Sequence, residues 1–373
     1  MSTESVVATI RASGERRAPL RITGRSNWLS AGRPVKADET LSLAADTGVV
    51  SYTPGDLTLT VRAGTSLREV ERVTAEHEQW LPLDPYGDAD GTIGATIATA
   101  SSGPLATAFG TPRDLLLGIE FVTGRGDVVR AGGKVVKNVA GFDLTRLLTG
   151  SWGTLGVITE ATVRLYARPK SDRTLVFRLG GSETQTASFL EAFGAAPLLP
   201  FAMEVVSVSV AKSLGLGEHP ACLVRLGGNT AAVDSQLIAL ARLGRTDEVE
   251  SRVWEALRLL DRDADFVIRL SGLPAKLRAA AGAMMADAIP GVYTCINIAR
   301  GVVRIIAKST RDAPAELAGF PLDGPVEGSF VFERLPAETW TTISPSVVAD
   351  PLSQGIKRAY DPFNLLNPGI LGD

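Results

Sequence analysis

Regularly spaced glycines mark the part of this sequence best suited to hold a ligand. Gly150, Gly153 and Gly156 recur at three-residue intervals, and an apolar run begins directly after them at Val157. Glycine lacks Cβ and accepts positive φ, so such a turn lets backbone N–H and C=O groups approach a flat or anionic ligand closely. The pattern predicts a turn that leads into a strand, with main chain lying against a planar cofactor.

Two further glycine-containing loops lie upstream, over residues 22–28 and 91–98, and any one of the three loops alone is more often only a turn. Together, in this order, and with the tail from Asp361 to Gly369, they resemble the PCMH-type flavoproteins of the vanillyl-alcohol-oxidase superfamily. Within that superfamily the chain is similar to the FAD-binding subunits of glycolate oxidases. The resemblance covers residues 20–170 and the tail, whereas residues 171–345 match only loosely.

The resemblance implies FAD as the cofactor. Residues 22–28 then form the first pyrophosphate loop and residues 91–98 the second, while Gly153, Gly156 and Ile158 make main-chain contacts to adenine and flavin. Covalent members of the family attach flavin through His or Cys near these loops, and residues 20–35 and 81–114 contain neither, so we expect non-covalent FAD. The implied cofactor-binding residues are Thr23, Gly24, Arg25, Ser26, Asn27, Trp28, Pro85, Thr92, Ile93, Gly94, Ala95, Ala98, Ser101, Gly153, Gly156, Val157 and Ile158.

The chain departs from the family pattern at two points. The first loop commonly has consecutive glycines, but here Gly24 stands alone, and Ala95 replaces the second glycine of the usual Ile-Gly-Gly. Neither change removes a backbone N–H, so cofactor binding remains the expectation. A nicotinamide-binding Rossmann fold is disfavoured because Gly150, Gly153 and Gly156 have the wrong spacing and lead into a strand.

Scarce cysteine and histidine exclude several chemistries. Two cysteines cannot hold a four-thiolate iron–sulfur cluster, and with two histidines a His-rich metal site is not expected, so we predict no metal. No catalytic residue is assigned. Arg269, Arg300, Arg304 and Lys308 are candidates to bind a carboxylate or reduced flavin, although most such residues solvate the outer face of a strand.

Three residues near the glycine turn have structural interpretations as well as functional ones. Lys137 and Asn138 precede the turn and could approach the flavin, although a turn-forming Asn is equally typical. Asp143 precedes a short helical pattern, which favours a helix N-cap over a proton acceptor.

The net charge and hydropathy of the sequence disfavour nucleic acid and the membrane interior as partners. The formal net charge of −3 gives no field for nucleic acid, no apolar run is long enough to span a membrane, and Met1 to Arg17 lack the apolar core of a secretory signal. We expect a cytoplasmic protein without direct membrane insertion, with membrane association through partners left open.

The fold class indicated is α+β. Residues 1–170 are expected to form a PCMH-type FAD-binding domain of two α+β subdomains, with a strand at 56–62, a capped helix at 67–78 and a hairpin over 115–130. Residues 171–345 are expected to form an α+β cap with a mixed or antiparallel sheet, and residues 346–373 to return to the first domain. Similar phrases at 176–180, 223–227 and 267–272, each followed by a helical pattern, indicate either a repeated strand–helix unit or coincidental strand ends.

The favoured function is the FAD-binding subunit of a glycolate (2-hydroxy acid) oxidase complex, which carries or relays electrons beside a catalytic flavoprotein subunit and an iron–sulfur subunit. One alternative is a stand-alone FAD-dependent dehydrogenase of a small hydroxy acid or alcohol, with Tyr293, Tyr360, an Arg or a carboxylate as base. A flavin-free structural subunit is the other.

Overall fold

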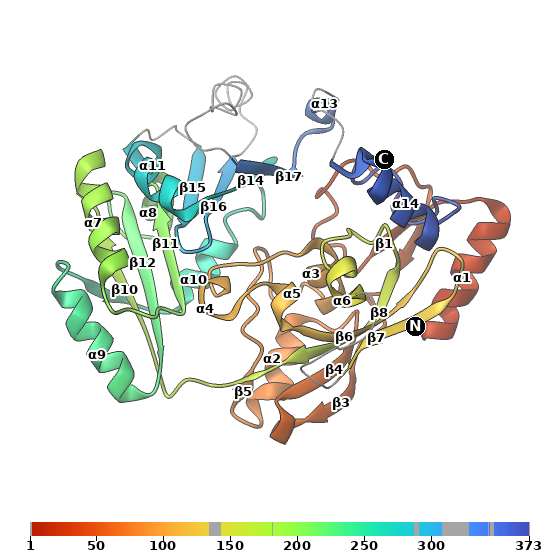
Figure 1. The fold of residues 1–373 in the computed structure, drawn as a ribbon, viewed down its shortest axis with the longest axis horizontal. Helices are drawn as coiled ribbons and strands as arrows, with labels where there is room; N and C mark the ends of the chain where they lie inside the picture. Colours follow the sequence, from red (N-terminus) through yellow and green to blue (C-terminus); the bar gives the residue numbers. More distant parts are fainter. Residues whose placement is uncertain are drawn as a thin grey trace. The chain divides into compact units, whose positions relative to one another are not determined.

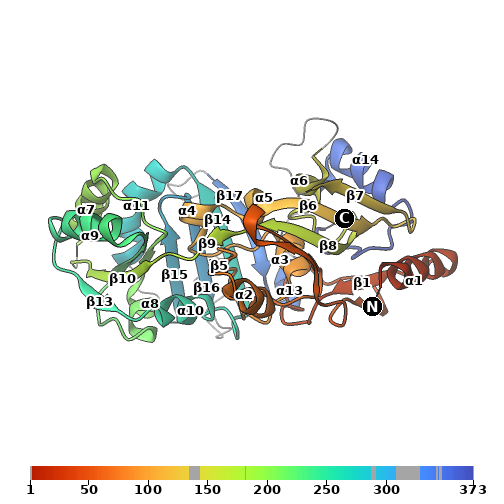
Figure 2. The same cartoon turned by 90° about the horizontal axis from the view of Figure 1, so that it is seen from below.

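The structure, a computed structural model, describes residues 2–133, 143–180, 182–286, 291–307, 328–341, 343 and 347–372. The chain folds into two compact units (Figures 1 and 2). Unit 1 comprises Met1–Ser102, Gly110–Arg168 and Ala337–Asp373, and unit 2 comprises Gly103–Phe109 and Pro169–Pro336. The short segment Gly103–Phe109 therefore packs with unit 2, although it lies inside the range assigned to the FAD-binding domain. The assignment of the cofactor domain and the cap to sequence ranges stays a prediction.

Unit 1 is built around a five-stranded antiparallel sheet in the order β3-β4-β8-β6-β7, accompanied by a parallel pair β1–β2 and an antiparallel pair β5–β9. Its apolar core includes Leu59 and Val61 of β4 and Ala161 and Val163 of β8, which alternate with polar residues along their strands. The elements are α1 Thr3–Arg16, β1 Leu20–Thr23, β2 Glu39–Ser42, β3 Val49–Thr53, η1 Pro54–Asp56, β4 Thr58–Arg62, α2 Leu67–Ala75, β5 Gln79–Trp80, α3 Ile93–Thr99, α5 Pro112–Leu115, β6 Leu116–Val122, β7 Val128–Gly132, α6 Leu144–Leu148, β8 Val157–Arg164, β9 Tyr166–Ala167, α13 Ala337–Trp340, η2 Val347–Ala349 and α14 Pro351–Tyr360.

Local signals in the sequence are confirmed in unit 1. Ser66 caps α2 by accepting from the amide of Glu69 (3.2 Å), and Asp143 caps α6 by accepting from the amide of Arg146 (3.1 Å). The hairpin of β6 and β7 turns at Gly126, whose φ of 79° a side chain would resist. Helix α1 was not among the elements expected from the sequence, which were the strand at 56–62, the helix at 67–78 and the hairpin over 115–130.

Unit 2 contains an eight-stranded sheet in the order β13-β10-β12-β11-β15-β16-β14-β17, and every strand pair described in it is antiparallel. Helices α7, α9 and α11 lie on one face, whereas α8 and α10 lie on the other (Figure 2). The elements are α4 Ala106–Phe109, β10 Ser171–Arg178, α7 Glu183–Ala195, β11 Ala202–Val206, α8 Val208–Ser213, β12 Ala221–Gly228, α9 Thr230–Ala241, β13 Asp247–Val249, α10 Arg252–Arg258, β14 Phe266–Gly272, α11 Pro274–Ala286, β15 Val292–Asn297, β16 Val302–Ala307 and β17 Gly328–Arg334.

The repeat in unit 2 is twofold. The first half has the order β11-β12-β10-β13 and the second half β15-β16-β14-β17, so each strand occupies the same place in its half, with β11 and β15 meeting at the centre. In each half a strand is followed by a helix and then by two further antiparallel strands, as in ferredoxin-like units. Strands β10 and β14 are equivalent, whereas β12 corresponds to β16. The similarity of residues 223–227 to the other two phrases is therefore strand-end chemistry.

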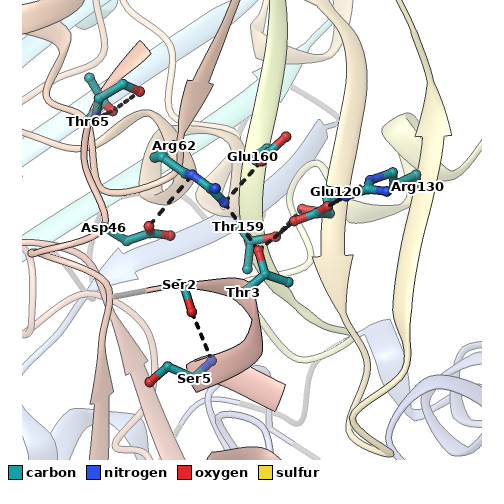
Figure 3. Close-up of polar contacts among 11 residues, drawn as sticks. Ser2, Thr3, Ser5, Asp46, Arg62, Thr65, Glu120, Arg130, Thr159 and Glu160 are labelled. Atoms are coloured by element: carbon teal, nitrogen blue, oxygen red, sulfur yellow. Dashed lines mark hydrogen bonds and ion pairs between the residues drawn. The ribbon is translucent and has the colours of Figure 1, made fainter. Parts of the chain in front are cut away.

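A buried polar cluster joins α1 to the main sheet of unit 1 (Figure 3). Glu120 of β6 accepts hydrogen bonds from the hydroxyls of Thr3 (2.8 Å) and Thr159 (2.7 Å) and pairs with Arg130. Burial acts to raise the pKa of Glu120, but these hydrogen bonds outweigh it and hold the pKa below its usual value. The cluster therefore anchors α1 through the Glu120 carboxylate, which stays ionised.

Arg62 of β4 lies beside two further carboxylates of the same cluster. Its guanidinium is 3.0 Å from Glu160 Oε1 and 4.0 Å from Asp46 Oδ1. Burial raises the pKa of both carboxyl groups, and the nearby Glu120 adds to the shift while Arg62 opposes it. Asp46 Oδ2 is buried without a hydrogen-bond partner.

Candidate functional site

The first and second glycine loops touch directly in unit 1. Gly24 follows β1, and Thr92 caps α3 by accepting from the amide of Ala95 (3.3 Å). A Cβ added at Gly24 would lie 2.4 Å from Thr92 Oγ1 and 3.1 Å from Thr92 Cγ2. Only glycine therefore allows the first loop to lie against the N-cap of α3. The single glycine that remains in this loop is the one that the packing requires.

The first loop presents backbone donors. Ser26 has a left-handed φ of 62°, and Arg25, Ser26 and Asn27 are exposed. Among the residues that the structure describes, the amides of residues 24–28 donate to no acceptor. Thr23 Oγ1 and Trp28 Nε1 are also buried without a partner. Consecutive free amides with flanking polar groups are the kind of backbone donors that bind anions in proteins, which is compatible with the pyrophosphate role that the resemblance implies.

In the second loop, by contrast, two backbone amides donate hydrogen bonds within the protein. The amides of Ile93 and Gly94 donate to the carbonyls of Thr65 and Ala63, both at 2.9 Å. A Cβ at Gly94 would lie 2.8 Å from that of Ala63, so this glycine lets α3 rest on the turn after β4. These two amides are committed within the protein, so any contact of this loop to pyrophosphate must come from other groups.

The remaining predicted members of the second segment lie around α3. Pro85 is buried, Ala98 and Ser101 are half-buried, and Ala95 is exposed. The carbonyl of Ala98 accepts from the amide of Trp152 (2.8 Å), and that of Ile97 accepts from Gly150 (3.0 Å). The C-terminal end of α3 therefore holds the third loop in place.

The third loop also meets the first. The rings of Trp28 and Trp152 stack with their centroids 6.1 Å apart and an interplanar angle of 17°. Gly150 and Gly153 have φ values of 81° and 71°, and a Cβ at Gly153 would lie 2.8 Å from Asn367 Nδ2. The three predicted loops are thus brought together, although direct contact of their residues with FAD stays a prediction.

Gly156, Val157 and Ile158 face the protein core. A Cβ at Gly156 would lie 2.5 Å from the ring of Phe121, while Val157 and Ile158 pair with Val122 and Phe121 in the ladder between β8 and β6. Both side chains are buried. Close packing on β6 explains this glycine, so a cofactor contact here would involve main-chain atoms alone.

Several candidates outside the loops have other roles. Arg304 is 4% exposed and pairs with Asp261 (2.7 Å) and Glu333 (2.6 Å), and Arg269 also pairs with Glu333 (3.0 Å). These two arginines are therefore occupied by carboxylates of unit 2. Arg300 is exposed. Lys137, Asn138 and Lys308 lie outside the described residues.

Two residues that the sequence did not assign to the site are Trp152 and Asn367. Trp152 lies between two of the glycines, and an aromatic ring inside a glycine turn was the available signal. Cys222 and Cys295 are buried and form no disulfide with each other, and burial raises the pKa of the Cys222 thiol. Within the described ranges, no group of three His, Cys, Asp or Glu residues is arranged to hold a metal ion. No helix in those ranges is long and apolar enough to cross a membrane.

Comparison with protein families gives a match to the FAD binding domain over residues 1–132. Glycolate oxidase subunit GlcE of Escherichia coli (strain K12) is 40% identical over 161 residues, which cover 43% of this chain and 45% of that protein. Glycolate oxidase subunit GlcD of Bacillus subtilis (strain 168) is 34% identical over 47% of this chain and 37% of that protein. The matches thus span less than half the length of these two relatives.

Other relatives match over nearly the whole chain. D-2-hydroxyglutarate dehydrogenase of Xanthomonas citri pv. viticola is 26% identical over 99% of this chain and 87% of that protein. Among solved structures, 4-ethylphenol oxidase from Gulosibacter chungangensis superposes with a TM-score of 0.73 at 16% identity, covering 100% of this chain and 88% of that one. This likeness shows the fold. Residues 1–132 thus match the FAD binding domain, the chain shares the α+β fold of 4-ethylphenol oxidase, and FAD is its cofactor.

Proposed function

We propose that this chain binds FAD non-covalently where its three loops meet, and that it serves as the FAD-binding subunit of a 2-hydroxy acid oxidase complex. The observation that carries the proposal is the convergence of the first loop, with its unpartnered amides, on Thr92 and Trp152. FAD bound there accepts and passes on electrons, while the protein supplies binding, orientation and electrostatics. The names of the two glycolate oxidase subunits support glycolate or a similar acid as the substrate.

The residues of unit 2 support a dependence on partners. Oxidation of a hydroxy acid needs a base near the reacting C–H and a cation for the carboxylate. Arg269 and Arg304 are neutralised by carboxylates of their own sheet, and His219, the one histidine in unit 2, is exposed in the loop before Pro220. A catalytic flavoprotein subunit and an iron–sulfur subunit would then supply the substrate site and the onward electron path.

A second candidate is a stand-alone FAD-dependent dehydrogenase of a D-2-hydroxy acid. The observation in its favour is the match to D-2-hydroxyglutarate dehydrogenase, which extends over 99% of the chain. In this case the reacting acid would be bound by this chain and no partner would be needed.

The visible spectrum of the purified chain separates the two candidates. Protein purified with FAD is mixed anaerobically with glycolate, D-lactate or D-2-hydroxyglutarate, first alone and then with a catalytic flavoprotein subunit and an iron–sulfur subunit of a glycolate oxidase. Bleaching of the flavin only in the presence of those subunits is the expected result. Bleaching by one of these acids in the chain alone, at the rate of the assembled complex, favours the dehydrogenase. A full-length chain that retains no FAD contradicts both.

A further inference from the structure

The C-terminal segment of unit 1 runs alongside the strand that leads into the first loop. The amide of Leu20 donates to the carbonyl of Leu365 (2.7 Å), and the amide of Asn367 donates to the carbonyl of Leu20 (3.0 Å). Leu20 and Leu366 form a parallel bridge. The segment thereby extends the pair of β1 and β2 with backbone from the far end of the sequence.

The side chain of Asn367 connects two of the three loops. Its Oδ1 accepts from the amide of Ile22 (2.7 Å), and its Nδ2 donates to the carbonyl of Trp152 (2.8 Å). Ile22 opens the first loop and Trp152 lies in the third. Asn367 is 4% exposed and has a left-handed φ of 46°, a conformation that asparagine tolerates. Both ends of one buried amide are therefore satisfied by the backbones of separate loops.

A second contact fixes the same segment from α14. Lys357 Nζ donates to the carbonyls of Thr154 (3.0 Å) and Leu366 (3.2 Å) and to Asp361 Oδ2 (2.8 Å). The Asp361 carboxylate in turn accepts from the amides of Leu365 (3.0 Å) and Leu366 (2.9 Å). The segment from Asp361 to Asn367 is thus held on both sides and forms a rigid support for the Asn367 amide.

We propose that Asn367 is a positioning residue for FAD, which sets the spacing between the first and third loops and so controls FAD affinity from the C-terminal segment. The inference rests on the proposed placement of FAD at these loops. Backbone donors bind an anion well only when they are held in place before binding, because ordering them on binding costs free energy. The Asn367 amide provides that order without touching the cofactor.

Asn367→Asp tests the proposal in the full-length chain. At pH 8 the carboxylate still accepts from Ile22 but cannot donate to the Trp152 carbonyl, which leaves that carbonyl without a partner. We expect the dissociation constant of FAD, measured by flavin fluorescence, to rise roughly tenfold or more, as a lost buried hydrogen bond implies. Burial next to the Trp152 carbonyl raises the pKa of the introduced carboxyl group, so lowering the pH to 5 favours its protonated form, which again offers a donor, and the difference from the parent protein should narrow. Asn364→Asp is the matched control, because Asn364 has a similar φ of 50° but an exposed side chain.

A purely structural role gives a different result. In that case Asn367→Asp lowers the unfolding midpoint of the apoprotein but leaves the FAD dissociation constant of the folded protein within about twofold of the parent value at both pH values. Such a result overturns the proposal. If Asn367→Asp does not fold, Asn367→Gly replaces it, because glycine keeps the left-handed backbone and removes the side-chain amide. Its unfolding midpoint and FAD dissociation constant are then compared with those of the parent protein in the same way. A parent chain that binds no FAD refutes the placement of the cofactor, and the positioning role with it. A parent chain that binds FAD beside an unaffected variant refutes the positioning role alone.

Discussion

Replacing Gly24 with alanine perturbs the contact on which the proposed FAD site depends most. The added Cβ would lie 2.4 Å from Thr92 Oγ1 and 3.1 Å from Thr92 Cγ2, well inside ordinary van der Waals contact. Either the first loop must move away from α3, or the Thr92 side chain must rotate and give up its cap on the amide of Ala95. Both responses disturb the junction of the first two loops.

The size of the effect follows from opposing contributions. Overpacking of this kind costs about 1–3 kcal/mol, and loss of a threonine N-cap costs about 1 kcal/mol. Replacement of glycine with alanine also restricts the unfolded chain, which returns about 0.4–1 kcal/mol. We therefore expect Gly24→Ala to lower the free energy of unfolding of the apoprotein by about 1–3.5 kcal/mol, and to weaken FAD binding because the unpartnered amides of the loop shift.

A double-mutant cycle isolates the contact. Thr92→Ala removes Oγ1 and Cγ2 and leaves only its Cβ, 3.3 Å from the new methyl group. The double variant should lose less stability than the sum of the single variants, with a coupling of about 1 kcal/mol. Urea unfolding of the apoprotein gives the stabilities, and titration with FAD gives the affinities. Gly55→Ala is the control, since in the described part of the chain no atom beyond the residues flanking Gly55 lies within 4 Å of a Cβ added there.

Two results would refute this reasoning. If Gly24→Ala matches the parent protein in stability and FAD affinity, the first loop does not lie on Thr92. If the single-variant effects add without coupling, the cost arises from the backbone at residue 24 and not from the contact.

Three further predictions concern the cofactor, the buried acids and the third loop. Acid precipitation should release all flavin into the supernatant, because the loops contain no His or Cys for a covalent bond; colour in the pellet would be contrary evidence. Burial raises the pKa of Asp46 above its usual value, so its ionisation costs stability as pH rises from the ordinary aspartate pKa of about 3.9 toward the raised pKa in the fold, and Asp46→Asn should gain stability relative to the parent protein over that rise. Gly156→Val should lower the thermal midpoint of the apoprotein, because the side chain meets Phe121, and an unchanged midpoint would argue against that packing.

Features specified by neighbouring residues could be predicted from the sequence. The caps at Ser66 and Asp143 and the turn at Gly126 each depend on side chains and φ angles within a few residues. Helix α1 was missed because its pattern is weak: only Val6, Ile10 and Ser13 are buried, and polar contacts of Thr3 with distant strands hold its start. Those contacts join residues that no local pattern connects.

In the candidate site, too, contacts between residues far apart in the sequence could not be predicted. The three loops were found because each carries its own glycine pattern, but their connections are not local. Asn367 bonds to Ile22 across 345 positions and to Trp152 across 215 positions. The tail was singled out only through the family resemblance, and nothing in the sequence indicated which backbone groups would meet the Asn367 amide.

The glycines of the third loop show why spacing alone does not assign a role. Gly153 has a left-handed φ and lies against Asn367, so both its backbone angle and its neighbour belong to the junction of the loops. Gly156 has no left-handed φ and lies against Phe121, at the start of β8. Because a side chain at Gly156 damages the core directly, loss of FAD from such a variant would follow from unfolding as readily as from a blocked cofactor contact. The Gly24, Thr92 and Asn367 variants act on contacts between the loops themselves, so apoprotein stability and FAD affinity measured side by side can separate cofactor binding from packing.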